Sequence, residues 1–159
     1  MPAATVKPFR HATRVYWEDT DAGGIVYYAN YLKFFERART EWLRSLGIEQ
    51  QQMRERDATM FIVSQTALRY HRPARLDDLL EITVAVSHAA RASLQLEQQA
   101  LRGTELLAEG TIRIACVDAP SLKLRRIPEQ ILDLLIAAPS RGDAPRVPQT
   151  RRHAPRVPQ

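Results

Sequence analysis

The sequence predicts an α+β fold in which a five-stranded antiparallel sheet curls around one long central helix. Apolar residues recur at helical spacing in the first third of the chain, and several later stretches alternate between apolar and polar residues. Short connections join the last of these stretches, as in antiparallel hairpins. With 159 residues, of which 45% are hydrophobic, the chain is long enough for one domain with a substantial core.

The helix is predicted to begin between residues 28 and 31, with Asn30 as its N-cap, and to end at Gly47. Before it, residues 14–17 can form a first strand, and residues 19–24 have the composition of a turn. The apolar stripe of the helix comprises Tyr31, Phe35, Ala38, Trp42 and Leu46. Such large aromatic residues need a broad apolar partner, so we expect the helix to pack on a sheet.

Four extended stretches follow a polar segment, residues 49–57, which we expect to be a loop or a short helical extension. The stretches cover residues 61–71, 80–88, 93–101 and 105–117. The second alternates most clearly, with Leu80, Ile82, Val84 and Val86 inward and Glu81, Thr83 and Ser87 outward. Tight turns at residues 89–92 and 102–104 make the last three stretches an antiparallel meander. A final helix is predicted to open at Pro128 and to end before Pro139.

The first of the four stretches carries apolar residues on both parities, so it can be buried on both sides. A long strand of this kind also leaves an edge that another chain can pair with. We therefore expect a homo-oligomer, a dimer at least.

Charge separates the predicted α+β domain, residues 1–139, from a basic tail, residues 140–159. The net charge is +5, and the tail alone holds five arginines and one aspartate, so the domain is nearly neutral. The tail repeats the hexapeptide APRVPQ and has almost no large apolar residues, which predicts disorder. We expect no nucleic-acid partner, because the basic charge lies in this tail and not on a folded surface.

The sequence shows no apolar run of the roughly 18 residues that a membrane span needs, and its start lacks the apolar core of a signal peptide. A single cysteine cannot form an internal disulfide. These observations predict a cytoplasmic location.

Two aspartates and two glycines lie directly before the long helix, at Asp19, Asp21, Gly23 and Gly24. A helix start offers unpaired N–H groups and a partial positive charge, which can hold an oxyanion. The spacing of the aspartates also suits a calcium loop, but such a loop needs a third oxygen ligand where Gly23 stands and an acidic residue where Asn30 stands, so we expect no metal. From the residues alone, both a turn cap and a catalytic carboxylate stay open.

The segment DTDAGGIVYYANY resembles acyl-CoA thioesterases of the 4-hydroxybenzoyl-CoA thioesterase hotdog superfamily. More closely, the blocks RVYWEDTDAGGIVYYANYLKFFERARTEWLR, RPARLDDLLEI and CVDAPSLKLRRIP resemble the Tol-Pal-associated acyl-CoA thioesterase family, over residues 14–135. The resemblance implies that Asp21 is catalytic, that a backbone N–H at Tyr28 binds the oxyanion, and that no cofactor is used. It also implies a dimer, commonly paired into a tetramer, with active sites at subunit interfaces. The tail has no counterpart in the family.

The chemistry leaves two routes open: attack by Asp21 through a mixed anhydride, which we favour slightly, or activation of a water by Asp21. Close relatives in the family carry histidine at the position of Tyr28, whereas 4-hydroxybenzoyl-CoA thioesterases carry tyrosine. A phenol has a reference pKa of about 10 and cannot replace histidine as a base at neutral pH. The second catalytic group and the acyl preference, short-chain or aromatic, therefore stay open.

Substrate contacts are predicted at Gly23 and Gly24, which let a substrate approach the main chain, and at Arg75 and Arg91, which can bind the phosphates of coenzyme A. A basic run at residues 123–126 can do the same, although solvated charge explains these residues equally well. An acyl carrier protein as partner and a peripheral association with the inner membrane are further expectations. The alternative function is a non-catalytic module that binds acyl-CoA or acyl carrier protein. A dehydratase is disfavoured, because residues 14–47 contain no histidine.

Overall fold

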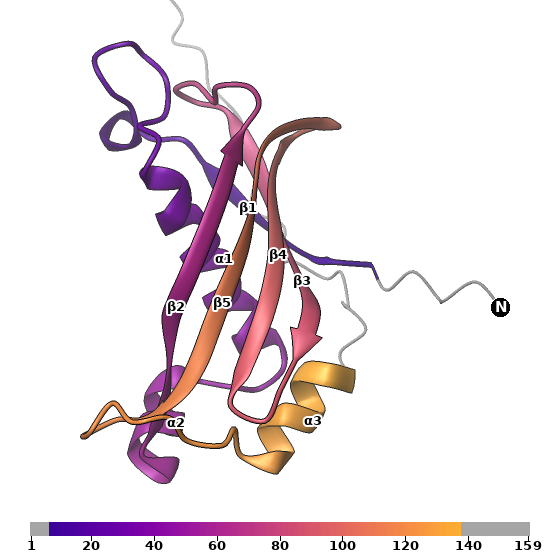
Figure 1. Ribbon diagram of the computed structural model, residues 1–159. Helices are drawn as coiled ribbons and strands as arrows, with labels where there is room; N and C mark the ends of the chain where they lie inside the picture. The colour runs from indigo at the N-terminus through magenta and orange to yellow at the C-terminus, as the bar shows by residue number, and fades with distance from the viewer. Residues whose placement is uncertain (1–6, 138–159) are drawn as a thin grey trace, which may run out of the picture.

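The computed structural model describes residues 7–137 and contains one five-stranded antiparallel sheet with strand order β1-β3-β4-β5-β2. The long helix α1 lies behind the sheet in Figure 1, and α2 and α3 lie on different sides of the lower end of the sheet. The strands are β1 (Phe9–Arg14), β2 (Thr59–Tyr70), β3 (Leu79–Ala89), β4 (Ser93–Arg102) and β5 (Glu105–Asp118). The helices are α1 (Asn30–Ser45), α2 (Gln50–Asp57) and α3 (Glu129–Ala137). The predicted α+β architecture is confirmed, and the predicted tail, residues 140–159, lies outside the described residues.

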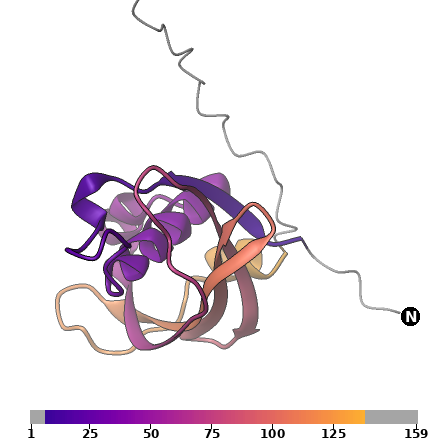
Figure 2. The same cartoon turned by 90° about the horizontal axis from the view of Figure 1, so that it is seen from above.

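Helix α1 packs through the predicted stripe. Tyr31, Phe35, Ala38 and Trp42 are buried, and Phe34 and Leu43 widen the buried face. Seen from above, the strands wrap around this helix (Figure 2). The helix ends as expected, since Gly47 adopts a left-handed φ of +79°.

The predicted N-cap of α1 is wrong. Asn30 is the first residue of the helix, and Ala29 precedes it without a side-chain cap. The Asn30 side chain instead donates a hydrogen bond to the Asp19 carbonyl at 2.8 Å. A backbone acceptor brought close by the preceding turn therefore competes successfully for the amide.

The first strand lies earlier than predicted, at β1 and not at residues 14–17. It pairs antiparallel with β3, from Phe9 opposite Val84 to Arg14 opposite Leu79. Beyond it, Trp17–Asp19 forms a short 3₁₀ helix. The position of β1 follows from its partner strand and not from its own residue pattern, because only Phe9 in it is fully buried.

The other strands agree with the prediction, and β3, β4 and β5 form the expected meander. Thr83 is a partial exception, because it is buried although its position faces outward; its hydroxyl accepts a hydrogen bond from the Gln99 N–H. Strand β2 forms one edge of the sheet and pairs only with β5, with a bulge between Val63 and Gln65. Its middle is exposed in the protomer, with Val63 at 50%, so burial on both sides is not observed here.

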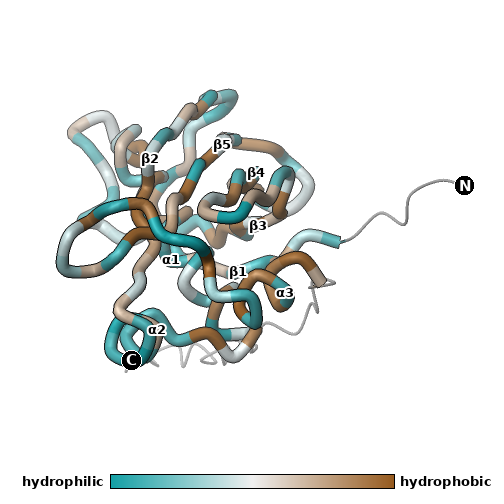
Figure 3. Tube along the Cα trace, turned by 60° about the horizontal axis from the view of Figure 1, so that its bottom comes forward, coloured by the Kyte–Doolittle hydropathy of each residue, from teal (hydrophilic) through white to brown (hydrophobic). Residues whose placement is uncertain are grey.

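The two short helices differ in character. Figure 3 shows α2 mostly hydrophilic and α3 mostly hydrophobic. Helix α2 buries only Met53, whereas α3 buries Leu135 but leaves Leu134 and Ile136 exposed. Among residues 7–137, none of the helices combines the length and apolar character needed to cross a membrane.

Candidate active site

The turn that carries Asp21 is a small hairpin directly before α1. Thr20 bridges to Val26, and the Asp21 N–H donates to the Ile25 carbonyl at 2.9 Å. The Gly24 N–H donates to the Asp21 carbonyl at 3.0 Å and so closes the turn. Gly24 adopts a left-handed φ of +74°. A residue with a side chain would be strained at this φ, so the glycine sets the shape of the turn.

The Asp21 carboxylate is exposed at the tip of this hairpin. Its Oδ1 accepts a hydrogen bond from the Gly23 N–H at 2.8 Å, and within residues 7–137 its Oδ2 has no partner. A Cβ added at Gly23 would lie 3.1 Å from Oδ1, so glycine permits this close approach. Asp21 is one of the residues that line a cleft of about 450 Å³, together with Trp17, Thr20, Ala22, Gly24 and Leu76. One carboxylate oxygen is thus held in place while the other is available to a ligand.

Asp19, the other aspartate of the motif, is only 5% exposed and serves the scaffold. Its carboxylate accepts a hydrogen bond from the Tyr16 N–H at 2.7 Å. Its carbonyl accepts from the Tyr27 N–H at 2.9 Å and from the Asn30 side chain. Asp19 therefore ties the turn to the first residues of α1.

The start of α1 leaves backbone donors free. The Tyr27 carbonyl accepts from the Asn30 N–H at 2.8 Å, but the N–H groups of Tyr28 and Ala29 have no acceptor among residues 7–137. Free donors at a helix start, together with the helix dipole, favour a negatively charged ligand. The structure thus puts unpaired N–H groups at the position for which the sequence predicts oxyanion binding.

Four tyrosines surround this helix start. Tyr28 is 61% exposed, and its ring contacts those of Tyr27 and Tyr70, with centroids 4.8 Å and 6.3 Å away. Tyr70 also contacts Tyr31, whose hydroxyl accepts a hydrogen bond from the Ala74 N–H at 3.1 Å. Burial raises the pKa of Tyr31 and of Tyr70, so both hydroxyls keep their protons at neutral pH.

The predicted arginines lie at opposite ends of the sheet. Arg75 bridges to Ile25, next to the Asp21 turn, and is exposed. Arg91 follows β3, whose 11 residues span about 36 Å, and its carbonyl accepts from the Ile127 N–H. Of the basic run, Arg125 donates to the Asp57 carbonyl at 2.9 Å and so closes the end of α2. Of these predicted basic residues, Arg75 is the one that the described chain brings next to the Asp21 turn.

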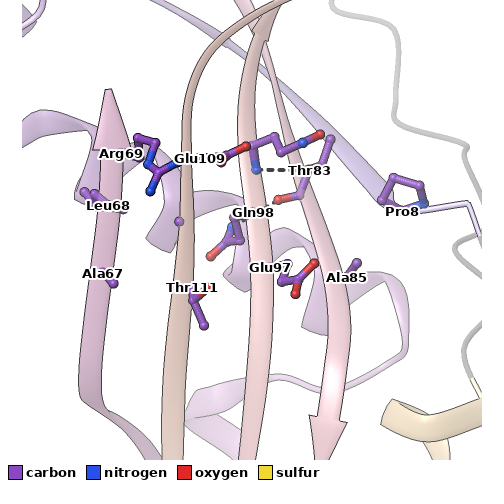
Figure 4. Close-up of a pocket in the computed structure, with 12 residues that line it drawn as sticks. Pro8, Ala67, Leu68, Arg69, Thr83, Ala85, Glu97, Gln98, Glu109 and Thr111 are labelled. Carbon is purple, nitrogen blue, oxygen red and sulfur yellow. Dashed lines mark hydrogen bonds between the residues drawn. The ribbon is translucent and has the colours of Figure 1, made fainter. Parts of the chain in front are cut away.

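A second hollow, of about 590 Å³, lies on the sheet face turned away from α1 (Figure 4). Its lining includes the charged side chains of Arg69, Glu97 and Glu109. It includes none of the residues for which the sequence predicts a role at the site. In the described part of the chain, no group of three or more His, Cys, Asp or Glu side chains is placed to hold a metal ion.

A family model described as the thioesterase-like superfamily matches residues 15–135, most of the chain. The chain belongs to the thioesterase-like superfamily. Membership confirms the expectation of a thioester hydrolase, and the five-stranded sheet around a long helix is the hotdog fold that the sequence predicted.

Individual relatives of the superfamily agree with this assignment. The chain is 45% identical over 123 residues to the acyl-CoA thioesterase YbgC of Haemophilus influenzae, covering 77% of this chain and 90% of the relative. It is 44% identical over 126 residues to the acyl-CoA thioester hydrolase YbgC of Escherichia coli, covering 78% and 92%. The crystal structure of a probable thioesterase from Bartonella henselae superposes with a TM-score of 0.74 at 34% identity, covering 77% of this chain and all of that one.

Sequence reasoning missed Tyr70. Its hydroxyl donates to the Tyr28 carbonyl at 2.9 Å, although 42 residues separate the two. Tyr70 ends an edge strand, and no local motif marks it. Only the pairing of β2 with β5, which fixes where β2 ends, brings it to the start of α1.

Proposed function

We propose that this protein hydrolyses acyl-CoA thioesters to free acid and coenzyme A, with Asp21 and the start of α1 as the reacting groups. One observation carries the proposal: an exposed carboxylate with a free oxygen precedes a helix start whose Tyr28 and Ala29 N–H groups have no acceptor among residues 7–137. The two YbgC relatives, which are named for acyl-CoA hydrolysis, support the choice of substrate.

In the route we favour, Asp21 Oδ2 attacks the thioester carbonyl carbon, and the carbonyl oxygen becomes an oxyanion that the N–H groups at the helix start stabilise. Collapse of this intermediate breaks the carbon–sulfur bond and releases the coenzyme A thiolate, leaving a mixed anhydride on Asp21. Water then cleaves the anhydride to the free acid and regenerates the carboxylate. The hydrogen bond from the Gly23 N–H to Oδ1 supports this route, because it orients the carboxylate with Oδ2 outward. The competing route uses Asp21 as a base for water.

The tyrosine rings at the helix start support a short or aromatic acyl group, because exposed rings favour stacking with another ring. For coenzyme A, Arg75 is the predicted phosphate contact next to Asp21. Arg91 and the basic run at residues 123–126 would have to act on a second copy of the chain. Antiparallel two-fold pairing of the exposed β2 edges would bring opposite ends of two protomers together, so we propose a dimer at least.

Several finer expectations, drawn from the sequence or from the family resemblance, stay predictions. They are an acyl carrier protein as partner, pairing of dimers into a tetramer, a cytoplasmic location, peripheral inner-membrane association and a link to the Tol-Pal system. Light scattering at micromolar concentration tests the assembly, and a monomer would contradict both the dimer and a shared site.

The test of the function is free-thiol release from short aliphatic, long aliphatic and aromatic acyl-CoAs. We expect turnover with at least one short or aromatic substrate, and loss of most of kcat in Asp21→Asn. Binding of every acyl-CoA without thiol release would favour the alternative function, a non-catalytic binding module.

A single turnover in water labelled with heavy oxygen separates the two chemical routes. In the anhydride route, water that attacks the aspartyl carbon leaves the heavy oxygen in Asp21 and gives the product an unlabelled oxygen from the carboxylate, whereas attack at the acyl carbon labels the product alone. Heavy oxygen in Asp21 therefore identifies the anhydride. Water activation by Asp21 labels the product alone. Mass spectrometry of the peptide that contains residues 19–24 reads out the difference.

A further inference from the structure

The hydroxyl of Tyr70 holds the backbone at the start of α1 from outside the helix. It donates to the Tyr28 carbonyl at 2.9 Å, and it comes from the last residue of β2. We propose that Tyr70 is a positioning residue that fixes the Tyr28–Ala29 peptide so that its free N–H points toward the substrate carbonyl. This inference rests on the proposed thioesterase function.

The planar Tyr28–Ala29 peptide links the hydrogen bond from Tyr70 to the direction of the Ala29 N–H. In a trans peptide the C=O and N–H groups point in opposite directions in one plane. The hydrogen bond from Tyr70 holds the Tyr28 carbonyl, so it also fixes where the Ala29 N–H points. No cis peptide bond occurs in the described chain, so this geometry applies.

The preceding peptide is fixed in a different way. The Tyr27 carbonyl accepts from the Asn30 N–H at 2.8 Å, and this local turn orients the Tyr28 N–H. Two successive peptides therefore present free donors, but only the first is held from within the helix start. The second depends on a side chain from the sheet edge, and without Tyr70 this peptide could rotate.

The Tyr70 hydroxyl and ring have separable roles. The ring packs edge-on against Tyr28 and at a tilt against Tyr31, with centroids 6.3 Å and 5.5 Å away. Phenylalanine keeps these contacts and removes only the hydrogen bond. The Tyr31 hydroxyl accepts from the Ala74 N–H, and within residues 7–137 the Tyr70 hydroxyl is the group that donates to the Tyr28 carbonyl.

The experiment compares Tyr70→Phe with the control Tyr16→Phe, using the full chain and the best acyl-CoA substrate. The Tyr16 side chain is exposed, and in the described part of the chain its hydroxyl makes no hydrogen bond. We expect Tyr70→Phe to lower kcat by about threefold to tenfold, the range of one hydrogen bond, with KM within about twofold. Tyr16→Phe should match the wild type. An unchanged kcat in folded Tyr70→Phe would overturn the proposal.

The affinity for an unreactive substrate analogue distinguishes a positioning role of the Tyr70 hydroxyl from general distortion of the site. A coenzyme A thioether lacks the carbonyl oxygen and cannot use the N–H groups, so its affinity should be equal in wild type and Tyr70→Phe. A parallel loss of thioether affinity would mean that the site is distorted generally, and would contradict the specific role of the hydroxyl.

A double-mutant cycle with Ala29→Gly adds a second test that does not depend on the size of the single effect. Glycine at position 29 makes peptide rotation easier. If the Tyr70 hydroxyl prevents that rotation, the combined variant should lose more kcat than the product of the two single losses. Independent effects would refute the proposal. Failure of the proposed function would give a different result. Asp21→Asn would then keep normal turnover, whether tyrosine or phenylalanine stands at position 70.

Discussion

The two ends of α1 close their backbone hydrogen bonds differently. After the last turn, the N–H groups of Leu46, Gly47 and Ile48 all donate to carbonyls of that turn, at 2.9–3.0 Å, and Ile48 is buried. At the start, the N–H groups of Tyr28 and Ala29 have no acceptor among residues 7–137. At the C-terminal end, the Leu43 and Arg44 carbonyls thus find donors in the chain that follows, whereas the start has N–H groups left for a ligand.

The two aspartates before the helix show the same contrast at shorter range. Asp19 is buried and uses its oxygens on Tyr16, Tyr27 and Asn30, whereas Asp21 is exposed and keeps one oxygen free in the described chain. The environment and not the residue type separates a scaffold carboxylate from one that can react.

The largest stability effect is expected at Asp19. Asp19→Ala removes the acceptor for the Tyr16 N–H in a buried position, so it should lower the free energy of unfolding by about 1–3 kcal/mol. Urea denaturation of Asp19→Ala and Asp21→Ala measures the contrast. Equal stability of the two variants would remove the distinction between the aspartates.

Two glycines allow a matched comparison of the helix ends. Gly24 and Gly47 both have left-handed φ values, and an added Cβ would meet nothing within 4 Å at either position. Alanine should therefore cost about 1–2 kcal/mol of stability at each. Only Gly24→Ala should also lower kcat, because only that turn carries Asp21. A comparable fall in kcat for Gly47→Ala would show that general strain, not the turn, is responsible.

The arginines should give a smaller effect, visible in KM. Arg75→Ala removes an exposed positive charge beside the Asp21 turn, for which we expect a rise of up to about fivefold in KM for acyl-CoA. The rise should shrink at high salt. Arg91→Ala serves as the distant comparison, and it should match Arg75→Ala only if a second copy brings Arg91 to the site. Steady-state kinetics at two salt concentrations test both.

The smallest effect is expected from deleting residues 140–159. The basic charge of the sequence is concentrated there, and the family model ends at residue 135. Deletion should leave kcat, assembly and thermal unfolding nearly unchanged. A large fall in turnover would make this segment part of the enzyme.

Local periodicity was enough to predict the parts of the fold that bury apolar surface. The stripe from Tyr31 to Trp42 and the alternation of β3 both follow from it. Contacts between distant segments were not predictable in this way. The start of β1 depends on pairing with β3, and the Asn30 side chain is bound by Asp19, 11 residues away.

In the candidate site, too, local motifs were predictable from the sequence and contacts between distant segments were not. Asp21, Gly23 and Gly24 form a continuous motif, so the sequence could point to them. Tyr70 contributes through a hydrogen bond across 42 residues, and Arg91 was grouped with Arg75 although β3 separates them. Sequence proximity identifies a turn, but it does not show which side chains the sheet brings to it.

The most direct test of the central claim is the kcat of Asp21→Asn beside that of Asp19→Asn, measured on the best acyl-CoA at a temperature where both variants are folded. Asparagine keeps the size of each side chain and removes its negative charge. We predict that Asp21→Asn loses most of kcat, whereas Asp19→Asn retains far more, because its carboxylate only orders the backbone. Near-normal thiol release by Asp21→Asn, or an equal loss in both variants, would contradict the assignment of the chemistry to Asp21.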